Sequence, residues 1–254
     1  MQPLAGSFGR KAMKDMTKAV VLAAGRGDRL QAHTNGRAKC LVSVAGRPLI
    51  DYVLSSLRQA GITDVLIVVG HHGEQIQAHV CDGAESGLRV SYARNEDYTR
   101  GNATSLLAAL PHMKREPFLL VMSDHLCSPR LLAVLRSQDG APNAIAIDRS
   151  SLTQERTDDA TKVALAGGRI VGLGKHLERW DAIDTGFSRW TPESFAAIAE
   201  PENGELAALM SRLAVNGTRV AACDISGHLW LDIDTGGDLR EAERLLREHG
   251  HLFA

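Results

Sequence analysis

The stretch Lys18–Leu30 (KAVVLAAGRGDRL) decides the fold, because an apolar run leads directly into a glycine-rich loop. The run over 18–24 is short and nearly continuous, which is typical of a strand buried on both faces of a parallel sheet. Gly25 and Gly27 then follow in the loop. In open parallel sheets, ligands bind beyond the carboxyl ends of the strands, and glycines let backbone N–H groups approach phosphate oxygens closely. The stretch predicts a phosphate-binding loop, with a tight strand-to-helix turn as the structural alternative.

The same order of apolar run, turn and amphipathic stretch repeats along the chain. The spacing predicts strands over 18–24, 64–70, 88–93, 117–122 and 143–148, and helices over 48–60, 74–80, 103–110 and 129–137. Later segments predict a hairpin over 162–174, helices near 192–199 and 203–216, a strand at 218–223 and a helix at 237–249. The pattern indicates the α/β class: a Rossmann-like, mostly parallel mixed sheet flanked by helices, in one domain with a substrate-side elaboration.

Length and composition narrow the class of protein. The chain has 254 residues, a net charge of -1 and no apolar run that approaches the roughly 20 residues of a membrane helix. We therefore expect no bulk attraction to nucleic acid, no membrane insertion and, at most, a homodimer as a protein partner. Residues 1–16 are expected to be a disordered leader, with a mitochondrial transit peptide as the alternative. The four cysteines form no CxxC pair, which favours neither a zinc site nor a disulfide framework and predicts a cytoplasmic protein.

Three cations accompany the glycine loop. Arg26 and Arg29 lie within it, and Lys39 follows soon after. Position 30 is Leu, so the third glycine of a dinucleotide fingerprint is missing, and no GKS or GKT follows as in a Walker motif. A triphosphate carries more charge than the pyrophosphate of a nicotinamide cofactor and needs such cations. The loop therefore favours an NTP over NAD.

Aspartates at two distant positions are candidates for holding a metal. Asp124 follows the predicted strand 117–122, at the same sheet edge as the glycine loop, although a turn or a helix cap would also explain it. Asp232 and Asp234 lie two positions apart in the strand-like stretch 229–235 (LWLDIDT) and so should share a face. Mg²⁺ prefers a few carboxylates completed by water and phosphate oxygens. We expect Mg²⁺ at Asp124 and Asp232, with Asp234 as a further ligand or as a helix cap.

Two segments near the start carry a family resemblance. They are LAAGRGDRL at 22–30 and AKCLVSVAGRPLI at 38–50, which contains Lys39. They resemble the LAAGxGxRL, PK and GxPLI segments of the sugar-phosphate nucleotidyltransferases, the MobA-like NTP transferases. Ala38 stands where that family usually has proline, which affects loop stiffness more than chemistry. The family places its second metal aspartate in a late WxD segment, which corresponds to Asp232.

Further segments are similar to the CTP:inositol-1-phosphate cytidylyltransferase branch of this family. The similarity runs from about residue 18 to residue 245, and the segments that carry it are GNATSLL (101–107), SDH (123–125), ATKV (160–163), GLGKHLERWDAIDTG (172–186) and LWLDIDT (229–235). The resemblance implies that residues 17–254 form the nucleotidyltransferase domain. Residues 17–149 would mainly bind the NTP, and residues 150–254 would mainly bind the acceptor and supply the second metal ligand.

The resemblance and the residue chemistry together imply a set of site residues. The catalytic residues would be Arg29, Lys39 and Lys175, and the nucleotide-binding residues Leu22, Ala23, Ala24, Gly25, Gly27, Asn102, Ala103, Ser105 and Asp124. The substrate-binding residues would be Lys162, Lys175, Asp184 and His125, and the metal ligands Asp124, Asp232 and Asp234. Helix capping is the alternative for Asn102 and Ser105, a turn for Asp184, and exposure to solvent for the two later lysines.

These residues predict a Mg²⁺-dependent nucleotidyltransferase that joins CTP to inositol 1-phosphate and releases pyrophosphate. Phosphocholine, a phosphonate or another sugar or cyclitol phosphate are alternative acceptors. A quaternary ammonium normally needs an aromatic cage, for which Trp180, Trp190 and Trp230 are candidates. A non-catalytic nucleotide sensor on the same fold, and a dinucleotide-dependent oxidoreductase, are alternatives from other functional classes.

Overall fold

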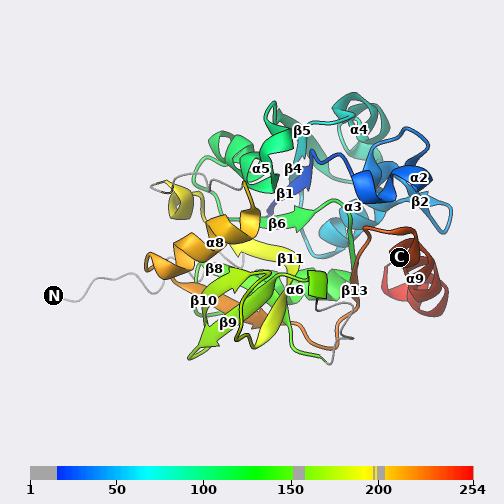
Figure 1. Cartoon of the computed structure of the whole chain (residues 1–254). Coiled ribbons are helices and arrows are strands. Elements are labelled where there is room, and N and C mark those ends of the chain that lie inside the picture. The colour runs from blue at the N-terminus through cyan, green and yellow to red at the C-terminus, as the bar shows by residue number, and fades with distance from the viewer. Residues whose placement is uncertain (1–15, 151–157, 197, 199–203, 254) are drawn as a thin grey trace.

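A nine-stranded mixed sheet forms the centre of the computed structural model, which describes residues 16–150, 158–196, 198 and 204–253 (Figure 1). Its strands are β1 (Lys18–Ala23), β4 (Asp64–Val69), β5 (Arg89–Arg94), β6 (Phe118–Met122), β8 (Asn143–Asp148), β9 (Lys162–Ala166), β10 (Arg169–Gly174), β11 (Ala182–Trp190) and β12 (Val220–Asp224). Two small two-stranded sheets accompany it, β2 (Ser43–Val44) with β3 (Arg47–Pro48) and β7 (His125–Cys127) with β13 (Trp230–Asp232).

Helices flank the sheet, as the alternating sequence pattern predicts. The α-helices are α2 (Gln31–Thr34), α3 (Leu49–Gln59), α4 (Gly73–Val80), α5 (Asn102–Ala109), α6 (Pro129–Ser137), α8 (Leu206–Val215) and α9 (Gly236–His249). Short 3-10 helices cover Asp28–Leu30, Lys39–Leu41, Ala84–Ser86, Tyr98–Arg100, Leu110–His112, Pro192–Phe195 and Gly250–Leu252.

The strand order places the glycine loop beside the first candidate metal ligand. The order is β5-β4-β1-β6-β11-β8-β12-β10-β9, and β1 pairs in parallel with both β4 and β6. The carboxyl ends of β1 and β6 therefore meet at one edge, where the backbone N–H of Ser123 donates to the carbonyl of Leu22 at 3.1 Å. β11 runs antiparallel between β6 and β8, and β9 and β10 form the predicted antiparallel hairpin. The expected mixed α/β fold is confirmed.

Alternating side chains of the strands build a separate core on each face of the sheet. Val21 on β1 packs in a core with residues of α3, α4 and α6, whereas its neighbours Val20 and Leu22 pack in a core with residues of α5 and α8. This alternation follows from the period of two along a strand, and it explains why the run over 18–24 is apolar at nearly every position.

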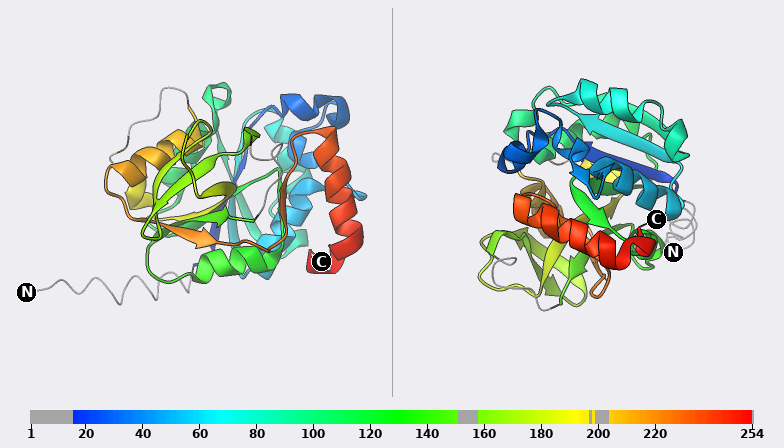
Figure 2. Two further views of the ribbon diagram at one scale, coloured as in Figure 1. Left: turned by 60° about the horizontal axis from the view of Figure 1, so that its bottom comes forward. Right: turned by 90° about the vertical axis from the view of Figure 1, so that its right-hand side faces the viewer.

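A third core attaches the C-terminal helix to the glycine-loop side of the molecule. Leu239 and Ala242 of α9 pack with Leu30 of the loop, Leu49 of α3 and Leu231 of β13. Figure 2 shows α9 lying along one side of the molecule, beside the helices of the first half. This packing brings the late aspartate segment to the edge that carries the glycine loop.

The boundaries of most predicted elements agree with the structure to within a few residues, but one central strand is missing from the prediction. β11 lies between β6 and β8, and the sequence pattern did not indicate it. The helix expected near 192–199 is a 3-10 helix over Pro192–Phe195, and residues 197 and 199–203 lie outside the described residues. The leader expected at 1–16 also lies outside them except for Met16, which is buried in the core of the α3 face.

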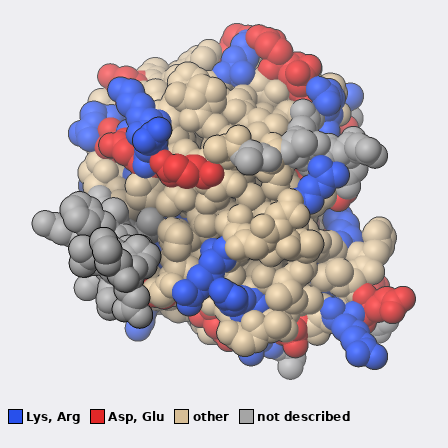
Figure 3. Space-filling view, turned by 90° about the vertical axis from the view of Figure 1, so that its left-hand side faces the viewer, with Lys and Arg blue, Asp and Glu red and all other residues tan. Residues whose placement is uncertain are grey.

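The surface agrees with the balanced composition. On the face shown in Figure 3, groups of positive and negative side chains alternate around a broad uncharged area. Within the described part of the chain, no helix combines the length and the apolar character needed to cross a bilayer. All four cysteines are free thiols, and Cys81 is the exposed one.

Candidate functional site

The glycine loop packs directly against the lysine that was expected to assist it. Gly27 has a φ of +68°, and a Cβ atom at this position would lie 2.7 Å from Cβ of Lys39. Glycine is therefore required here both by the backbone conformation and by the space available. The hydrocarbon stem of Lys39 fills the position that a side chain at Gly27 would occupy, and its ammonium group points to the carboxylates at the sheet edge.

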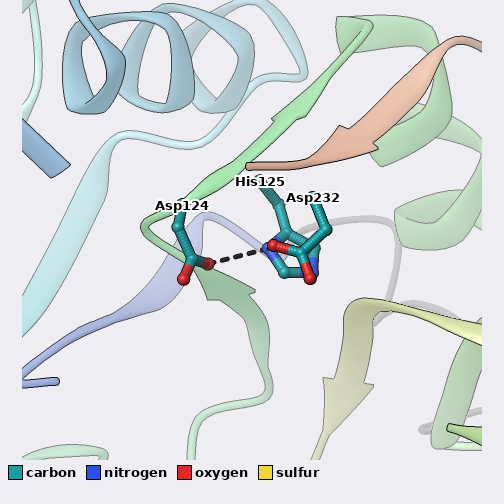
Figure 4. Close-up of side chains that lie close together, drawn as sticks. All are labelled: Asp124, His125 and Asp232. Atoms are coloured by element: carbon teal, nitrogen blue, oxygen red, sulfur yellow. Dashed lines mark hydrogen bonds and ion pairs between the residues drawn. The ribbon is translucent and has the colours of Figure 1, made fainter. Parts of the chain in front are cut away.

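The small β7–β13 sheet brings the two distant aspartate segments together. Asp232 is paired in register with His125, and the backbone N–H of Ile233 donates to the carbonyl of Asp124 at 3.0 Å. Figure 4 shows the side chains of Asp124, His125 and Asp232 turned toward one another from these neighbouring segments. One ligand atom from each lies within 4.8 Å of the others, which makes these three residues a candidate metal-binding group.

His125 occupies the space between the two carboxylates. Its Nδ1 atom lies 2.8 Å from Oδ1 of Asp124 and 3.4 Å from Oδ1 of Asp232. Burial alone would lower the pKa of His125, but Asp232 and Asp124 outweigh burial and raise it to about 9. The imidazole is therefore protonated at neutral pH and acts as a cation between two acids.

The two carboxylates differ in pKa. Burial would raise the pKa of Asp124, but Lys39 and His125 outweigh this effect and hold it far below its ordinary range. Burial raises the pKa of Asp232 to about 6, and the nearby charges of Asp124 and Asp234 add to the increase. Oδ1 of Asp232 is buried and has no hydrogen-bond partner among the described residues. An added divalent cation would coordinate this oxygen, which otherwise faces Nδ1 of His125 at 3.4 Å, and would lower the pKa of Asp232. The residues therefore fit a metal bound by carboxylate oxygens.

Lys39 is a shared counter-ion for two carboxylates. Its Nζ atom lies 2.6 Å from Oδ2 of Asp124 and also forms an ion pair with Asp234. Only 11% of the lysine side chain is exposed. Burial would lower the pKa of Lys39, but the two aspartates outweigh burial and raise it, so the ammonium stays charged.

Asp234 is not one of the three residues of the candidate metal-binding group, and its carboxylate forms ion pairs with Lys39 and Arg29. β13 ends at Asp232, so the strand spacing that would place both aspartates on one face does not continue to Asp234. The cap of α9 is Thr235, which forms a reciprocal capping box with Asp238, so the expected helix-cap role also belongs to a neighbour.

Arg29 and Lys175 come from the two halves of the chain and meet at one carboxylate, that of Asp159. The Nη1 atom of Arg29 lies 2.7 Å from Oδ2 of Asp159, and Nζ of Lys175 lies 2.6 Å from Oδ1. The sequence analysis did not identify Asp159, because it stands in a polar segment without a motif. Lys162, the other lysine expected at the acceptor side, donates from Nζ to the carbonyl of Lys175 at 3.0 Å and so supports the segment that carries Lys175.

The predicted nucleotide residues lie at the expected edge, but several of their side chains are engaged within the protein. Asn102 accepts a hydrogen bond from the backbone N–H of Leu206 at the start of α8, and Ser105 accepts one from Asn95. Both side chains therefore make the structural contacts that helix capping and burial predict. The side chains of Leu22, Ala23 and Ala24 are buried, which leaves their backbone groups and the exposed Gly25 as possible contacts, while the backbone N–H of Ala103 donates to the carbonyl of Gly204.

Asp184 and Gly186 belong to an irregular part of β11 that faces the His125 ring. The register of β11 against β8 shifts between Asp184 and Ser188, and Gly186 has a φ of +77°. A Cβ atom on Gly186 would lie 2.5 Å from Nε2 of His125, so glycine makes room for the imidazole. Burial raises the pKa of Asp184 to about 6, and its Oδ1 accepts a hydrogen bond from the backbone N–H of Gly186.

Comparisons with known proteins show what this chain is similar to. The profile of the MobA-like NTP transferase domain matches residues 19–155. A Rubrobacter xylanophilus protein named "Bifunctional IPC transferase and DIPP synthase" is 37% identical over 232 residues, covering 90% of this chain and 51% of that protein. The N-acetylmuramate alpha-1-phosphate uridylyltransferase of Neisseria meningitidis is 30% identical, covering 90% of this chain and 97% of its own length.

A solved structure of a nucleotidyltransferase also resembles this chain. That of the inositol-1-phosphate CTP transferase from T. maritima has a TM-score of 0.78 at 25% identity and covers 92% of this chain and 97% of that chain. This chain spans about half the length of the bifunctional relatives it matches. With the family profile over more than half of the chain and relatives of 30% identity or more, the chain belongs to the MobA-like NTP transferase family, a family of nucleotidyltransferases.

Proposed function

We propose that this chain transfers the cytidylyl group of CTP to a phosphorylated polyol, with inositol 1-phosphate as the first candidate, and depends on Mg²⁺. The observation that carries the proposal is the meeting of two cations, Lys39 and Arg29, with the Asp124–Asp232 pair at the edge that holds the glycine loop. Anionic phosphates and a divalent cation require such a combination of charges. The names of the bifunctional relatives and of the T. maritima structure support the choice of CTP and inositol 1-phosphate.

The reaction needs no nucleophile from the protein. An oxygen of the acceptor phosphate attacks the α-phosphorus of CTP, the bond from that phosphorus to the β-phosphate bridging oxygen breaks, and pyrophosphate leaves. The protein contributes position and charge. Arg29 and Lys39 neutralise the triphosphate, the backbone of Gly25 and Gly27 approaches its oxygens, and Lys175 holds the incoming phosphate. Asp124 and Asp232 would hold Mg²⁺, which supplies further neutralisation of the phosphate charge when bound.

We assign Asp184 to recognition of the acceptor. It lies on β11 close to the His125 ring, on the side where β9 and β10 extend the sheet. A carboxylate at this position accepts hydrogen bonds from polyol hydroxyl groups, and these bonds replace the water that the partly exposed side chain would otherwise retain. This role distinguishes a polyol from an acceptor without hydroxyl groups.

The tryptophans argue against phosphocholine. Trp190 is fully buried against Phe195, and Trp230 donates its indole N–H to Asp148 at 2.9 Å. Of the three candidates for an aromatic cage, only Trp180 is exposed. A uridylyltransferase for a sugar 1-phosphate is the second candidate function, because the Neisseria relative carries such a name and matches over nearly its whole length.

Pyrophosphate release across four NTPs and a panel of phosphorylated alcohols tests the proposal. We expect the highest kcat/KM with CTP and inositol 1-phosphate, loss of turnover on chelation and its return on addition of Mg²⁺. Asp124→Asn should lower turnover by about a hundredfold or more, since it removes a metal ligand and a partner of Lys39. Asp224→Asn, a substitution of an exposed aspartate on β12, serves as the control. Turnover with UTP and a hexose 1-phosphate alone would replace the cytidylyl proposal with the second candidate.

A further inference from the structure

The carboxylate of Asp159 lies where two cations from different halves of the chain converge. Each of its oxygens pairs with one of them, Oδ2 with Arg29 at 2.7 Å and Oδ1 with Lys175 at 2.6 Å. Arg29 lies on the glycine loop and Lys175 follows β10. The inference below rests on the proposed function, which assigns these cations to the triphosphate and to the acceptor phosphate.

One small anion can therefore contact both cations at once. The two carboxylate oxygens of Asp159 provide the same pair of contacts that two oxygens of a phosphate group would provide. We propose that Asp159 occupies the binding position of the substrate phosphate between Arg29 and Lys175, and that the arriving phosphate displaces it. Asp159 is then an internal competitor of the acceptor phosphate and a determinant of its apparent affinity.

The exposed fractions of the side chains indicate that an arriving phosphate displaces Asp159 and not Asp234. The side chains of Asp159, Arg29 and Lys175 are 61%, 56% and 43% exposed, whereas those of Asp234 and Lys39 are 20% and 11% exposed. Exposed ion pairs contribute little to stability, and breaking a buried pair is much less favourable. Asp159 can leave by rotation of an exposed side chain, while Asp234 keeps Lys39 and Arg29 in place.

Charge favours the exchange. Hydrogen bonding to Lys175 and to Arg29 lowers the pKa of Asp159, so its carboxylate carries a full negative charge at neutral pH. A phosphate monoester carries about −1.5 to −2 at pH 7 and offers three acceptor oxygens, so it interacts with the two cations more strongly than a carboxylate does. Lys162 holds the backbone of Lys175 through its 3.0 Å hydrogen bond, which keeps one cation near the position after Asp159 has left.

Removal of the competitor should strengthen phosphate binding. In Asp159→Ala we expect the KM for the acceptor phosphate to fall about three- to tenfold, the gain that follows from no longer breaking two exposed ion pairs. Asp159→Asn should give part of this decrease, because an amide keeps hydrogen-bonding capacity without charge. The decrease should shrink as ionic strength rises, since salt screens exposed pairs. The change should appear in KM and not as a gain in kcat, because the carboxylate leaves before the chemical step.

The experiment compares the unsubstituted chain with Asp159→Ala, Asp159→Asn and the control Asp158→Ala, which removes the same charge one residue away. Steady-state pyrophosphate release gives KM and kcat for the acceptor, and calorimetry gives the affinity of each protein for inorganic phosphate without any turnover. A lower KM and a tighter phosphate affinity in Asp159→Ala, absent in Asp158→Ala, support the inference. Equal or weaker values in Asp159→Ala overturn it. If the wild type transfers no nucleotide to any acceptor, the proposed function fails, and the phosphate affinities alone still decide the role of Asp159.

Discussion

Replacing Lys39 with methionine tests the central charge arrangement of the site, because Lys39 is the shared counter-ion of Asp124 and Asp234. Breaking a buried ion pair costs about 3–5 kcal/mol. The two carboxylates are each 20% exposed, so we expect the lower end of that range, about 3 kcal/mol. For a domain of about 250 residues this corresponds to a decrease in Tm of roughly 6–12 °C. Loss of one preorganised donor to the phosphates should lower turnover about a hundredfold.

The assay combines thermal unfolding with pyrophosphate release at saturating CTP and acceptor. Lys18→Met is the matched control, because Lys18 also forms an ion pair, with Glu116, but lies at the opposite end of β1 from the glycine loop. It should keep its turnover. If Lys39→Met turns over within about fivefold of the wild type, Lys39 has no role in the chemistry. If its Tm is unchanged, the two aspartates do not depend on Lys39 as a counter-ion.

Two further substitutions test the geometry around His125. Asp184→Asn should raise the free energy of unfolding by about 2 kcal/mol at pH 8 and by almost nothing at pH 4. Partial burial raises the pKa of this carboxylate to about 6, so it opposes folding only where it is ionised. The same variant should bind a polyol phosphate more weakly, and an equal Tm gain at both pH values would contradict the burial argument. Gly186→Ala should lower turnover at least tenfold. The Cβ atom of the new alanine would lie 2.5 Å from Nε2 of His125 and would therefore displace the imidazole ring. Gly217→Ala is its control, since Gly217 also has a positive φ but open space around it, and equal losses in the two variants would refute the steric explanation.

The first half of the fold was predictable because its strands β1, β4 and β6 are nearly continuous apolar runs followed by turns. β11 was not, because polar residues interrupt it although it lies between two central strands. Arg189 is fully buried and donates to the carbonyls of Leu135, Arg136, Gln138 and Ala141, while Thr185 donates to the carbonyl of Ala146. Long-range backbone acceptors bind the Nη atoms of Arg189 and the hydroxyl group of Thr185. The hydrophobic pattern along the sequence does not show which distant backbone groups will accept these hydrogen bonds. A strand stabilised in this way is therefore predicted as a loop.

The positions of those site residues that directly follow a strand were predictable from the sequence. Asp124 follows a recognisable strand, and parallel pairing places it beside the glycine loop. Asp232 follows an apolar run, and the pairing of β7 with β13 places it opposite His125. Asp159 pairs with Arg29 across 130 positions, and only the folded arrangement of the two halves brings them together. The alternative of Asp234 as a helix cap was wrong, because Thr235 caps α9, and its role as a further metal ligand stays a prediction.

Opposite charges alternate through the whole site, and this alternation limits how substrates can bind. The sequence of contacts runs through Lys175, Asp159, Arg29, Asp234, Lys39, Asp124, His125 and Asp232. Because each cation in this series of contacts already has a carboxylate partner, a triphosphate that binds these cations must displace a carboxylate or bring a cation of its own. The exposed end at Asp159 can exchange its partner, and the end at Asp232, whose buried Oδ1 has no hydrogen bond and faces His125 at 3.4 Å, can accept an added cation. We therefore expect different ligands at the two ends, an anion at one and a divalent cation at the other, and the proposed metal-bound nucleotide with a phosphorylated acceptor would supply both.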